Sequence, residues 1–433
     1  MLNIEHLAAR VGQLRDGGAA RATHSVSRWR WRSGCPNAPG IHGPTKHVFF
    51  HGRADDATGD THIHEFRWDG NPRTWHHDDL TQITGAPLTQ DSPSSYMFKG
   101  RATKHVIYQG FDKVRGNDGR INELLWDGHW HHNDLSAAAH PPGDTHAPFT
   151  IGEPFGYEYS FFDTINNHNN ISRHVVYRTI DQQLSFLSWG GPAPLTENWH
   201  PSTFLPDVPG GVSPPTAYVF SVQGHEVQGQ ASQRVLYLSP HMVPDIQHVH
   251  ELSWNEKGPN LFSWVLNDLT VLTGAPPLGN GDANPVGLMH DLEFTLHVFY
   301  GRNQDRHLYE LYWNELGWHV NDLTAIMGST DIAESAGFDS GPPLAYVHLQ
   351  HGTLNVNYLG TDGHIHALWR DVGTPWNNVN KQNLTMPIGA PPGLGNQPVG
   401  FVFRDLTQHI FYLAGPSSNS RIGDIIELTD EPM

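Results

Sequence analysis

The chain has 433 residues, of which 37% are hydrophobic and only 16% are charged. Its 44 acidic side chains outnumber the 26 basic ones and give a formal net charge of −18, which argues against nucleic acid or an anionic membrane as a partner. The single cysteine, Cys35, excludes an intrachain disulfide, and no run approaches the ~18 consecutive apolar residues of a membrane-spanning helix. The first residues do not have the pattern of a signal peptide, so we expect a protein that is cytoplasmic or released without one.

One short motif of the form His-Val-x-Tyr recurs, with variations, about every 60 residues along the whole chain. A period of this size is typical of a repeat architecture in which each copy is one supersecondary unit. The seven copies begin at His47, His105, His174, Arg234, His297, Asn355 and His409.

Each copy contains four segments with the pattern of short strands. In the fourth copy these are an alternating apolar segment at 217–220, the motif at 234–238, a segment at 248–254 that ends in Trp, and a segment at 264–270. β-Branched and aromatic residues dominate these segments, Gly and Pro separate them, and a helical period of 3.6 residues is missing. We therefore predict an all-β fold, a seven-bladed β-propeller of four-stranded antiparallel blades. The single domain is predicted to span 1–433, with blade cores at approximately 24–84, 94–140, 156–206, 216–275, 286–328, 343–390, and 398–433 together with 1–12.

The N-terminal strand is predicted to close the ring. The seventh copy ends without a fourth strand, whereas the segment from Asn3 to Gly12 matches the pattern that ends the fourth strand in other copies. An N-terminal strand in this place removes the two open sheet edges. A short N-terminal helix is the alternative, because the sequence from Leu7 to Arg10 tolerates one.

Two recurrent polar groups are interpreted as structural, and no cofactor is expected. The aspartate of the Asn-Asp-Leu sequence, which ends the fourth strand, is expected to accept hydrogen bonds from backbone amides. Adjacent histidines, as in Trp-His-His, point to opposite faces of a strand, so one such pair is not expected to chelate a metal ion. The aspartates are Asp79, Asp134, Asp268 and Asp322.

The residues that open the motif can also take part in sugar recognition. An Arg or His on the second strand and a Glu on the third can hold adjacent hydroxyl groups, while a nearby aromatic ring stacks on the apolar face of a pyranose. An Arg-Val-Tyr strand, a turn, an Ile-x-Glu strand and a following Trp together resemble the repeat of the fungal fucose-binding lectins. Those lectins are β-propellers that bind sugar between adjacent blades.

The resemblance implies five sugar sites between blades, each with two polar residues from one blade and two aromatic residues from the next. These sites combine Arg234 and Glu251 with Trp313 and Trp318, His47 and Glu65 with Trp126 and Trp130, His105 and Glu123 with Trp189 and Trp199, His297 and Glu310 with Trp369 and Trp376, and His409 and Glu427 with Trp68 and Trp75.

The chain departs from the lectin pattern in several ways. His replaces Arg in five copies, the Glu is lost from the third copy, and it is Ala367 in the sixth. That family has six blades, whereas seven are predicted here. Each His–Glu pair therefore has a second interpretation, as a hydrogen bond that stabilises its blade.

The expected function is a multivalent carbohydrate-binding lectin, with fucose as one candidate sugar. Its partners would be glycans or glycoconjugates, and homo-oligomerisation is left open. An enzyme with one polar or metal-containing site in the central channel is the alternative, and His290, Asp291 and His348 would lie there. These three residues also fit a hydrated channel lining, and no catalytic sequence motif occurs. A protein-interaction platform is the third class.

Overall fold

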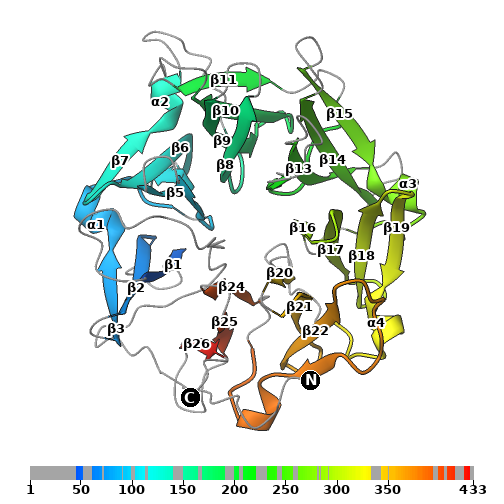
Figure 1. The fold of residues 1–433 in the computed structure, drawn as a ribbon. Helices are drawn as coiled ribbons and strands as arrows, with labels where there is room; N and C mark the ends of the chain where they lie inside the picture. The colour runs from blue at the N-terminus through cyan, green and yellow to red at the C-terminus, as the bar shows by residue number, and fades with distance from the viewer. Residues whose placement is uncertain are drawn as a thin grey trace.

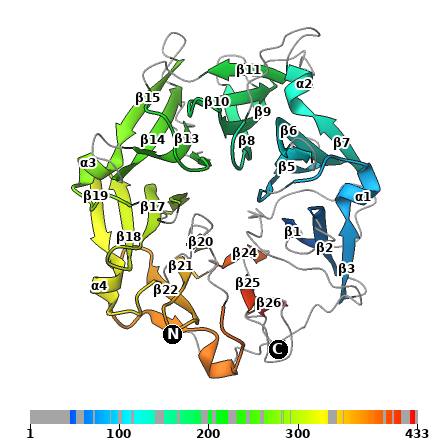
Figure 2. The same ribbon diagram turned by 180° about the vertical axis from the view of Figure 1, so that it is seen from behind.

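The strands form seven antiparallel sheets, which are arranged in a ring with one sheet for each copy of the motif (Figure 1). Within a sheet the strands run in chain order from the inside of the ring to its rim, as the view from behind also shows (Figure 2). The predicted seven-bladed β-propeller is confirmed. The computed structural model describes residues 45–51, 61–70, 73–89, 91–98, 103–112, 116–139, 150–163, 168–190, 199–203, 208–220, 232–240, 246–256, 262–279, 282, 284–290, 292–332, 343–349, 351–393, 398–403, 407–414 and 424–429.

The first three blades hold the first eleven described strands and two short helices. Blade 1 consists of β1 (Thr45–His51), β2 (Ile63–Gly70), β3 (Arg73–Asp79) and α1 (Leu80–Thr84). Blade 2 consists of β4 (Ser94–Phe98), β5 (Thr103–Asp112), β6 (Gly116–Trp126), β7 (Trp130–Asp134) and α2 (Leu135–Ala139). Blade 3 consists of β8 (Phe155–Asp163), β9 (His168–Arg178), β10 (Leu184–Trp189) and β11 (Trp199–Thr203).

The remaining four blades follow the same order. Blade 4 consists of β12 (Thr216–Phe220), β13 (Ser232–Pro240), β14 (Gln247–Glu256), β15 (Phe262–Asp268) and α3 (Leu269–Thr273). Blade 5 consists of β16 (Val286–His290), β17 (Thr295–Arg302), β18 (His307–Asn314), β19 (Gly317–Asp322) and α4 (Leu323–Met327). Blade 6 consists of β20 (Leu344–His348), β21 (Thr353–Leu359), β22 (Ile365–Asp371), β23 (Lys381–Asn383) and η2 (Met386–Ile388). Blade 7 consists of β24 (Val399–Phe403), β25 (Thr407–Ala414) and β26 (Asp424–Thr429).

Blades 1 and 7 each contribute three strands within the described residues. The strand predicted at 3–12 to close the ring lies outside these residues, and so does the first strand expected for blade 1. The described seam between the two blades is nevertheless packed. The ring of Phe411 in blade 7 meets Trp75 of blade 1 edge-on, with the ring centroids 6.1 Å apart, and Phe411 shares a hydrophobic cluster with Phe49.

The hydrophobic core lies between blades. Neighbouring residues of a strand point to opposite faces, so each strand can fill the spaces on both sides of its blade. Val298 packs into the cluster shared with blade 4, and the next residue, Phe299, packs into the cluster shared with blade 6. This arrangement explains why the second strand of each copy is apolar on both faces.

In three blades the tyrosine of the motif fastens the blade to the preceding linker. The hydroxyls of Tyr108, Tyr300 and Tyr412 donate hydrogen bonds of 2.9 to 3.2 Å to the carbonyls of proline residues in these linkers. Each proline ends a Gly-Ala-Pro sequence, and the three are Pro87, Pro276 and Pro391. A buried phenol thereby gains a partner and fixes the path of the chain between two blades.

A one-turn helix, not an extended linker, follows the outer strand in four of the blades. The predicted role of the aspartates is confirmed, because one carboxylate oxygen of each accepts the backbone N–H three residues ahead at 2.8 to 3.0 Å. The other oxygen of Asp79, Asp268 and Asp322 lies 2.7 Å from a histidine Nδ1 at the start of the third strand. None of the helices in the described part of the chain is long and apolar enough to cross a membrane.

Removing the cap of α4 should destabilise the protein. We expect Asp322→Ala to lower the free energy of unfolding by about 1–2 kcal/mol, because the amide of Ala325 and the ring of His307 both lose their acceptor. Asp322→Asn keeps an acceptor for the amide and should cost less. Urea unfolding followed by tryptophan fluorescence measures both, and equal loss in the two variants would contradict the capping role.

Candidate functional site

The predicted His–Glu pairs form the same hydrogen-bonded arrangement in four blades. The histidine Nδ1 lies 2.5 to 2.8 Å from a glutamate oxygen, and its Nε2 lies 2.7 to 3.0 Å from a threonine hydroxyl two residues earlier. Hydroxyl, imidazole and carboxylate in this order also occur in catalytic triads. Here the histidines are buried and the arrangement repeats around the ring, which fits the interpretation as a stabilising bond. The pairs are His47 with Glu65, His105 with Glu123, His297 with Glu310, and His409 with Glu427.

A lysine from blade 2 reaches the carboxylate of blade 1. We name each junction by its two blades, and in junction 1/2 the Nζ of Lys104 lies 3.5 Å from Glu65 Oε1. The same ammonium lies 4.4 Å from the ring centroid of Trp126 and 5.2 Å from that of Trp130. The four residues predicted for this site are thus brought together, with Lys104 between the glutamate and the aromatic pair.

The charges of this junction follow from burial and from Lys104. Burial and the nearby ammonium lower the pKa of His47, so its ring is neutral. Burial acts to raise the pKa of Glu65, but Lys104 and the hydrogen bond from His47 bring it down to about 2. Burial lowers the pKa of Lys104 while Glu65 opposes this change, and the two tryptophan faces also favour the charged form. The junction therefore holds an ion pair next to a neutral imidazole.

Arginine takes the same place in junction 2/3. Arg173 Nη1 lies 3.6 Å from Glu123 Oε1, and the guanidinium carbon is 4.0 Å from the ring centroid of Trp189 and 5.1 Å from that of Trp199. Both tryptophans are buried. The space between the predicted polar pair and the predicted aromatic pair is again occupied by a cation of the following blade.

Junction 7/1 also has a lysine at this position. Lys46 lies with its Nζ 4.3 Å from the ring centroid of Trp68, while His409 Nδ1 and Glu427 Oε1 pair at 2.8 Å on the other side. Trp75, the second predicted aromatic, packs against Phe411 of blade 7.

Junction 5/6 is closed by a tryptophan. The indole Nε1 of Trp376 donates to Glu310 Oε2 at 2.8 Å, and Asn321 donates to the same oxygen at 2.7 Å. Trp376 was expected on the fourth strand, but it lies in the loop before β23, after Pro375, whose missing N–H cannot join a ladder. Trp369 lies on β22 but pairs with Asn355, whereas Arg370 pairs with Leu354 at the place that Trp313 takes opposite Leu296, so Trp369 points away from junction 5/6.

Junction 4/5 differs from all of these. Arg234 Nη1 donates to Glu251 Oε2 at 2.7 Å, Asn267 donates to the same oxygen at 3.1 Å, and Tyr218 donates to Oε1 at 2.9 Å. All three donors belong to blade 4. Among the described residues, no side chain of blade 5 hydrogen-bonds to Glu251, and the residue at the position of Lys104 is Leu296.

The two tryptophans predicted for junction 4/5 lie side by side on blade 5. Leu296 pairs with Trp313 across strands β17 and β18, and Trp313 pairs with Trp318 across β18 and β19. Both rings are half-buried and pack against the cluster that blades 4 and 5 share. The side chain of Arg234 keeps 16% of its surface exposed, whereas that of Glu251 is fully buried.

Blade 3 shows what replaces the site where the glutamate is missing. Phe186 contacts both His174 and Trp264 of the next blade, and the hydroxyl of Ser172 lies 2.7 Å from His174 Nε2. Without a carboxylate beside it, burial alone lowers the pKa of His174 to about 3.

Sequence reasoning missed the residue that precedes the motif. It alternates with the first residue of the motif and therefore faces the previous blade, and in blades 1 to 5 it lies directly across the strand pair from a tryptophan, as Lys104 faces Trp126. In blade 6 its partner is Arg370. This position is Lys46, Lys104, Arg173, Gln233, Leu296, Leu354 and Gln408 in the seven copies. The alternation of side chains along a strand, with a period of two residues, is the signal that could have identified this position.

The channel residues form a separate group. His290 and His348 end the inner strands β16 and β20, and both are buried. His290 Nδ1 lies 4.0 Å from Glu293, while His348 Nδ1 accepts the backbone N–H of His351 at 3.3 Å. Neither belongs to a cluster of three potential metal ligands among the described residues, and Asp291 lies outside those residues. A metal or catalytic site in the channel stays a prediction.

No family model matches the chain, and no curated protein matches it. Among solved structures, a variant of Aleuria aurantia lectin in complex with Fucalpha1-6GlcNAc is 13% identical, with a TM-score of 0.43, over 77% of this chain and 93% of that one. An ulvan lyase is 11% identical, with a TM-score of 0.48, over 97% and 96%. An alpha-L-arabinanase from Penicillium chrysogenum is 12% identical, with a TM-score of 0.42, over 76% and 90%. Since these TM-scores lie below 0.5, the fold and the site rest on the sheets and side chains described above.

Replacing Lys104 should leave a buried carboxylate without its counter-charge. We expect Lys104→Leu, which introduces the residue found in blade 5, to lower the free energy of unfolding by about 3 kcal/mol at pH 7. Lys104→Arg keeps a cation at this place, as Arg173 does in junction 2/3. It should lower the free energy of unfolding by less than about 1 kcal/mol. Chemical denaturation of the three proteins measures the difference. Similar stability of Lys104→Leu and the native chain would contradict the ion pair.

The buried His174 should make stability depend on pH. Its folded pKa of about 3 lies below the ordinary value of about 6.5, so the unfolded chain binds a proton between these limits and the folded chain does not. The free energy of unfolding therefore falls as the pH is lowered from about 6.5 toward 3. In His174→Asn, which introduces the residue of blade 6, this contribution is lost. We subtract the free energy of unfolding of the variant from that of the native chain. This difference should fall by about 1.4 kcal/mol for each pH unit below about pH 6.5 and stay constant above it. A difference independent of pH would contradict the buried neutral ring.

Proposed function

We propose that this protein is a carbohydrate-binding lectin whose principal sugar site is junction 4/5, formed by Arg234, Glu251, Trp313 and Trp318. The proposal rests on which blade supplies the hydrogen-bond donors to the glutamate. In junctions 1/2, 2/3 and 5/6 a side chain of the following blade reaches this carboxylate, whereas in junction 4/5 the hydrogen bonds to Glu251 among the described residues all come from its own blade.

The polar pair suits a sugar with adjacent hydroxyl groups. Glu251 is fully buried and already accepts from three donors, so its part in the site is to hold Arg234 in place and to balance its charge. A guanidinium has five N–H donors, and the bonds of Arg234 to Ser232 and Glu251 use two of them. The remaining donors can reach a ring or hydroxyl oxygen. Since the exposed part of Arg234 loses water on binding, the site should reject molecules without matching hydroxyls.

The two tryptophans supply the apolar side of the site. Their neighbour Leu296 places no charge over them, unlike Lys104 over Trp126 or Arg173 over Trp189. A half-buried indole can stack on the C–H face of a pyranose while its other face packs on the protein. The lectin resemblance makes fucose the first sugar to test.

Several sites would be needed for tight binding to a glycan-coated surface. One shallow site gives low affinity, and linked sites gain by raising the effective concentration. A lysine, an arginine or Trp376 lies in the other predicted junctions, so a sugar would have to displace it there. Multivalency would then come from those weaker junctions or from association of several chains.

Glycan-array binding of the full chain, with free fucose as competitor, tests this proposal. We expect Arg234→His to weaken binding at least ~10-fold, because it converts the blade to the His–Glu arrangement of blades 1, 2, 5 and 7 while keeping the fold. Leu296→Lys introduces the cation of junction 1/2 and should have the same effect.

Leu354→Lys is the matched control. It places a lysine at the equivalent position of blade 6, opposite Arg370 in junction 5/6, where Trp376 already reaches Glu310, and should leave the binding at junction 4/5 unchanged. Melting temperatures show that each variant is folded. A native chain that binds no glycan, or equal binding by the native chain and Leu296→Lys, would refute a sugar site in junction 4/5.

A further inference from the structure

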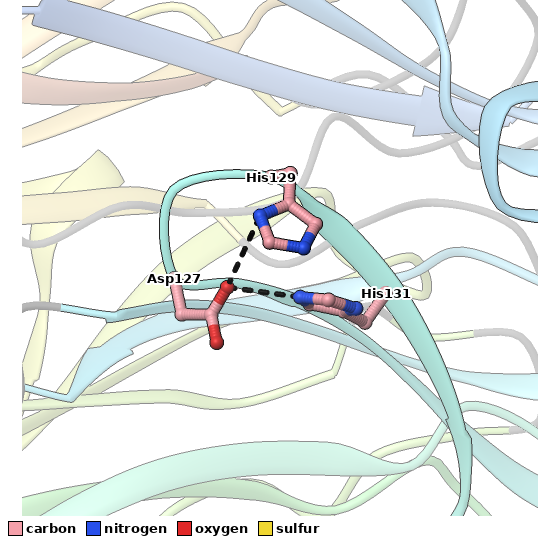
Figure 3. A group of neighbouring side chains, drawn as sticks. All are labelled: Asp127, His129 and His131. Carbon is pink, nitrogen blue, oxygen red and sulfur yellow. Dashed lines mark hydrogen bonds and ion pairs between the residues drawn. The ribbon is translucent and has the colours of Figure 1, made fainter.

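The hairpin between β6 and β7 carries three potential metal ligands. Asp127 and His129 lie in its turn and His131 lies on β7, and Figure 3 shows that the three side chains converge. The backbone N–H of Asp127 donates to the carbonyl of His129 at 3.4 Å, and Gly128 between them has φ +128°, a conformation that favours glycine. The turn therefore holds the three residues close together at the rim of blade 2.

One carboxylate oxygen faces both rings. Asp127 Oδ1 lies 2.9 Å from His131 Nε2 and 3.9 Å from His129 Nδ1, and the ring centroids of the two histidines are 4.1 Å apart. All three ligand atoms lie within 4.8 Å of one another. Ligands bound tetrahedrally to zinc at about 2.0–2.1 Å are separated by roughly 3.3 Å. The observed distances bracket this value, so small side-chain rotations would bring the atoms into a coordination shell.

We propose that Asp127, His129 and His131 form a binding site for a divalent transition-metal ion. Two imidazoles and one carboxylate suit Zn²⁺, Ni²⁺ or Cu²⁺ better than the oxygen-seeking Mg²⁺ or Ca²⁺. Three protein ligands leave at least one coordination position to water or to another molecule. All three residues are accessible to solvent, so an ion can enter without a change in the fold.

The corresponding hairpin of blade 5 separates the structural part of this arrangement from the binding part. There Asn314 Oδ1 lies 3.1 Å from His319 Nε2, which matches the contact of Asp127 with His131. This contact between side chains therefore stabilises the hairpin in both blades. The carboxylate and the third residue, His129, are what blade 2 adds, since blade 5 has an amide and the uncharged Leu316 in its turn.

A second cluster with similar ligands is explained by the fold. His248, His250 and Asp268 lie close together, but Asp268 caps α3 with one oxygen and accepts from His248 with the other. The same capped His–Asp pair occurs as His62 with Asp79 and as His307 with Asp322. Among the described residues, His129 of the hairpin cluster takes part in no such structural pair that recurs in other blades.

The metal site is independent of the proposed sugar site. It lies on blade 2, and its test needs no glycan. Failure of one proposal therefore leaves the other untouched.

Titration of the full chain with Zn²⁺ by isothermal calorimetry tests the site. Asp127→Asn copies Asn314 and keeps an acceptor for His131, so it should preserve the hairpin while removing the anionic ligand. His129→Ser changes an exposed ring that the fold does not need. We expect each to weaken the tightest Zn²⁺-binding event at least tenfold, and Co²⁺ added to the native chain should give a visible absorption that both variants lack.

His76→Ser is the control, because the chain has 31 histidines and other weak binding is expected. It removes an exposed histidine of the blade 1 hairpin, which lies 3.1 Å from the Thr74 hydroxyl. Loss in both hairpin variants with an unchanged control supports the site. Equal Zn²⁺ affinity and stoichiometry in the native chain, Asp127→Asn and His129→Ser would overturn it.

Discussion

A buried carboxylate on the third strand is the constraint on which the polar structure of this propeller depends. Glu65, Glu123, Glu251 and Glu310 are at most 1% exposed. A charged carboxylate removed from water is costly unless hydrogen bonds and a counter-charge surround it. The histidine or arginine of the second strand supplies one donor, and an asparagine of the fourth strand supplies another in three blades. The remaining hydrogen bonds and the counter-charge must come from elsewhere in the blade or from the next blade.

The ways in which the blades meet this constraint set junction 4/5 apart from the others. Lys104 and Arg173 complete the first two carboxylates from the neighbouring blade, and Trp376 completes that of blade 5. Blade 4 completes Glu251 by itself, through Arg234 and Tyr218. Only a carboxylate that is satisfied within its own blade leaves the facing tryptophans without a cation upon them. The residue before the motif and the donors to the carboxylate together set the chemistry of a junction, since Leu296 and Leu354 occupy the same position but only Glu310 receives a tryptophan of the next blade.

The fold could be predicted from the sequence because its signals are local. Strand alternation, the Asp79-type caps and the seven motif copies each depend on residues a few positions apart. The partners in the junctions could not be predicted in the same way, since Lys104 and Glu65 are 39 residues apart in the chain and belong to different blades. The register of Lys104 opposite Trp126 was nevertheless implied by the period of two. Trp376 could not be placed, because its contact with Glu310 depends on the path of a loop.

Repeated features and departures from the repeat have different origins in such a chain. The Thr–His–Glu arrangement and the tie between the hairpin residues occur in several blades, so the fold accounts for them. Arg234 and His129 each differ from their counterparts, and the fold does not require these differences. Since a blade of a propeller contacts its two neighbours and little else, one junction or hairpin can change while the others keep their structure. The same independence would let the proposed sugar site and the proposed metal site arise on a single ring.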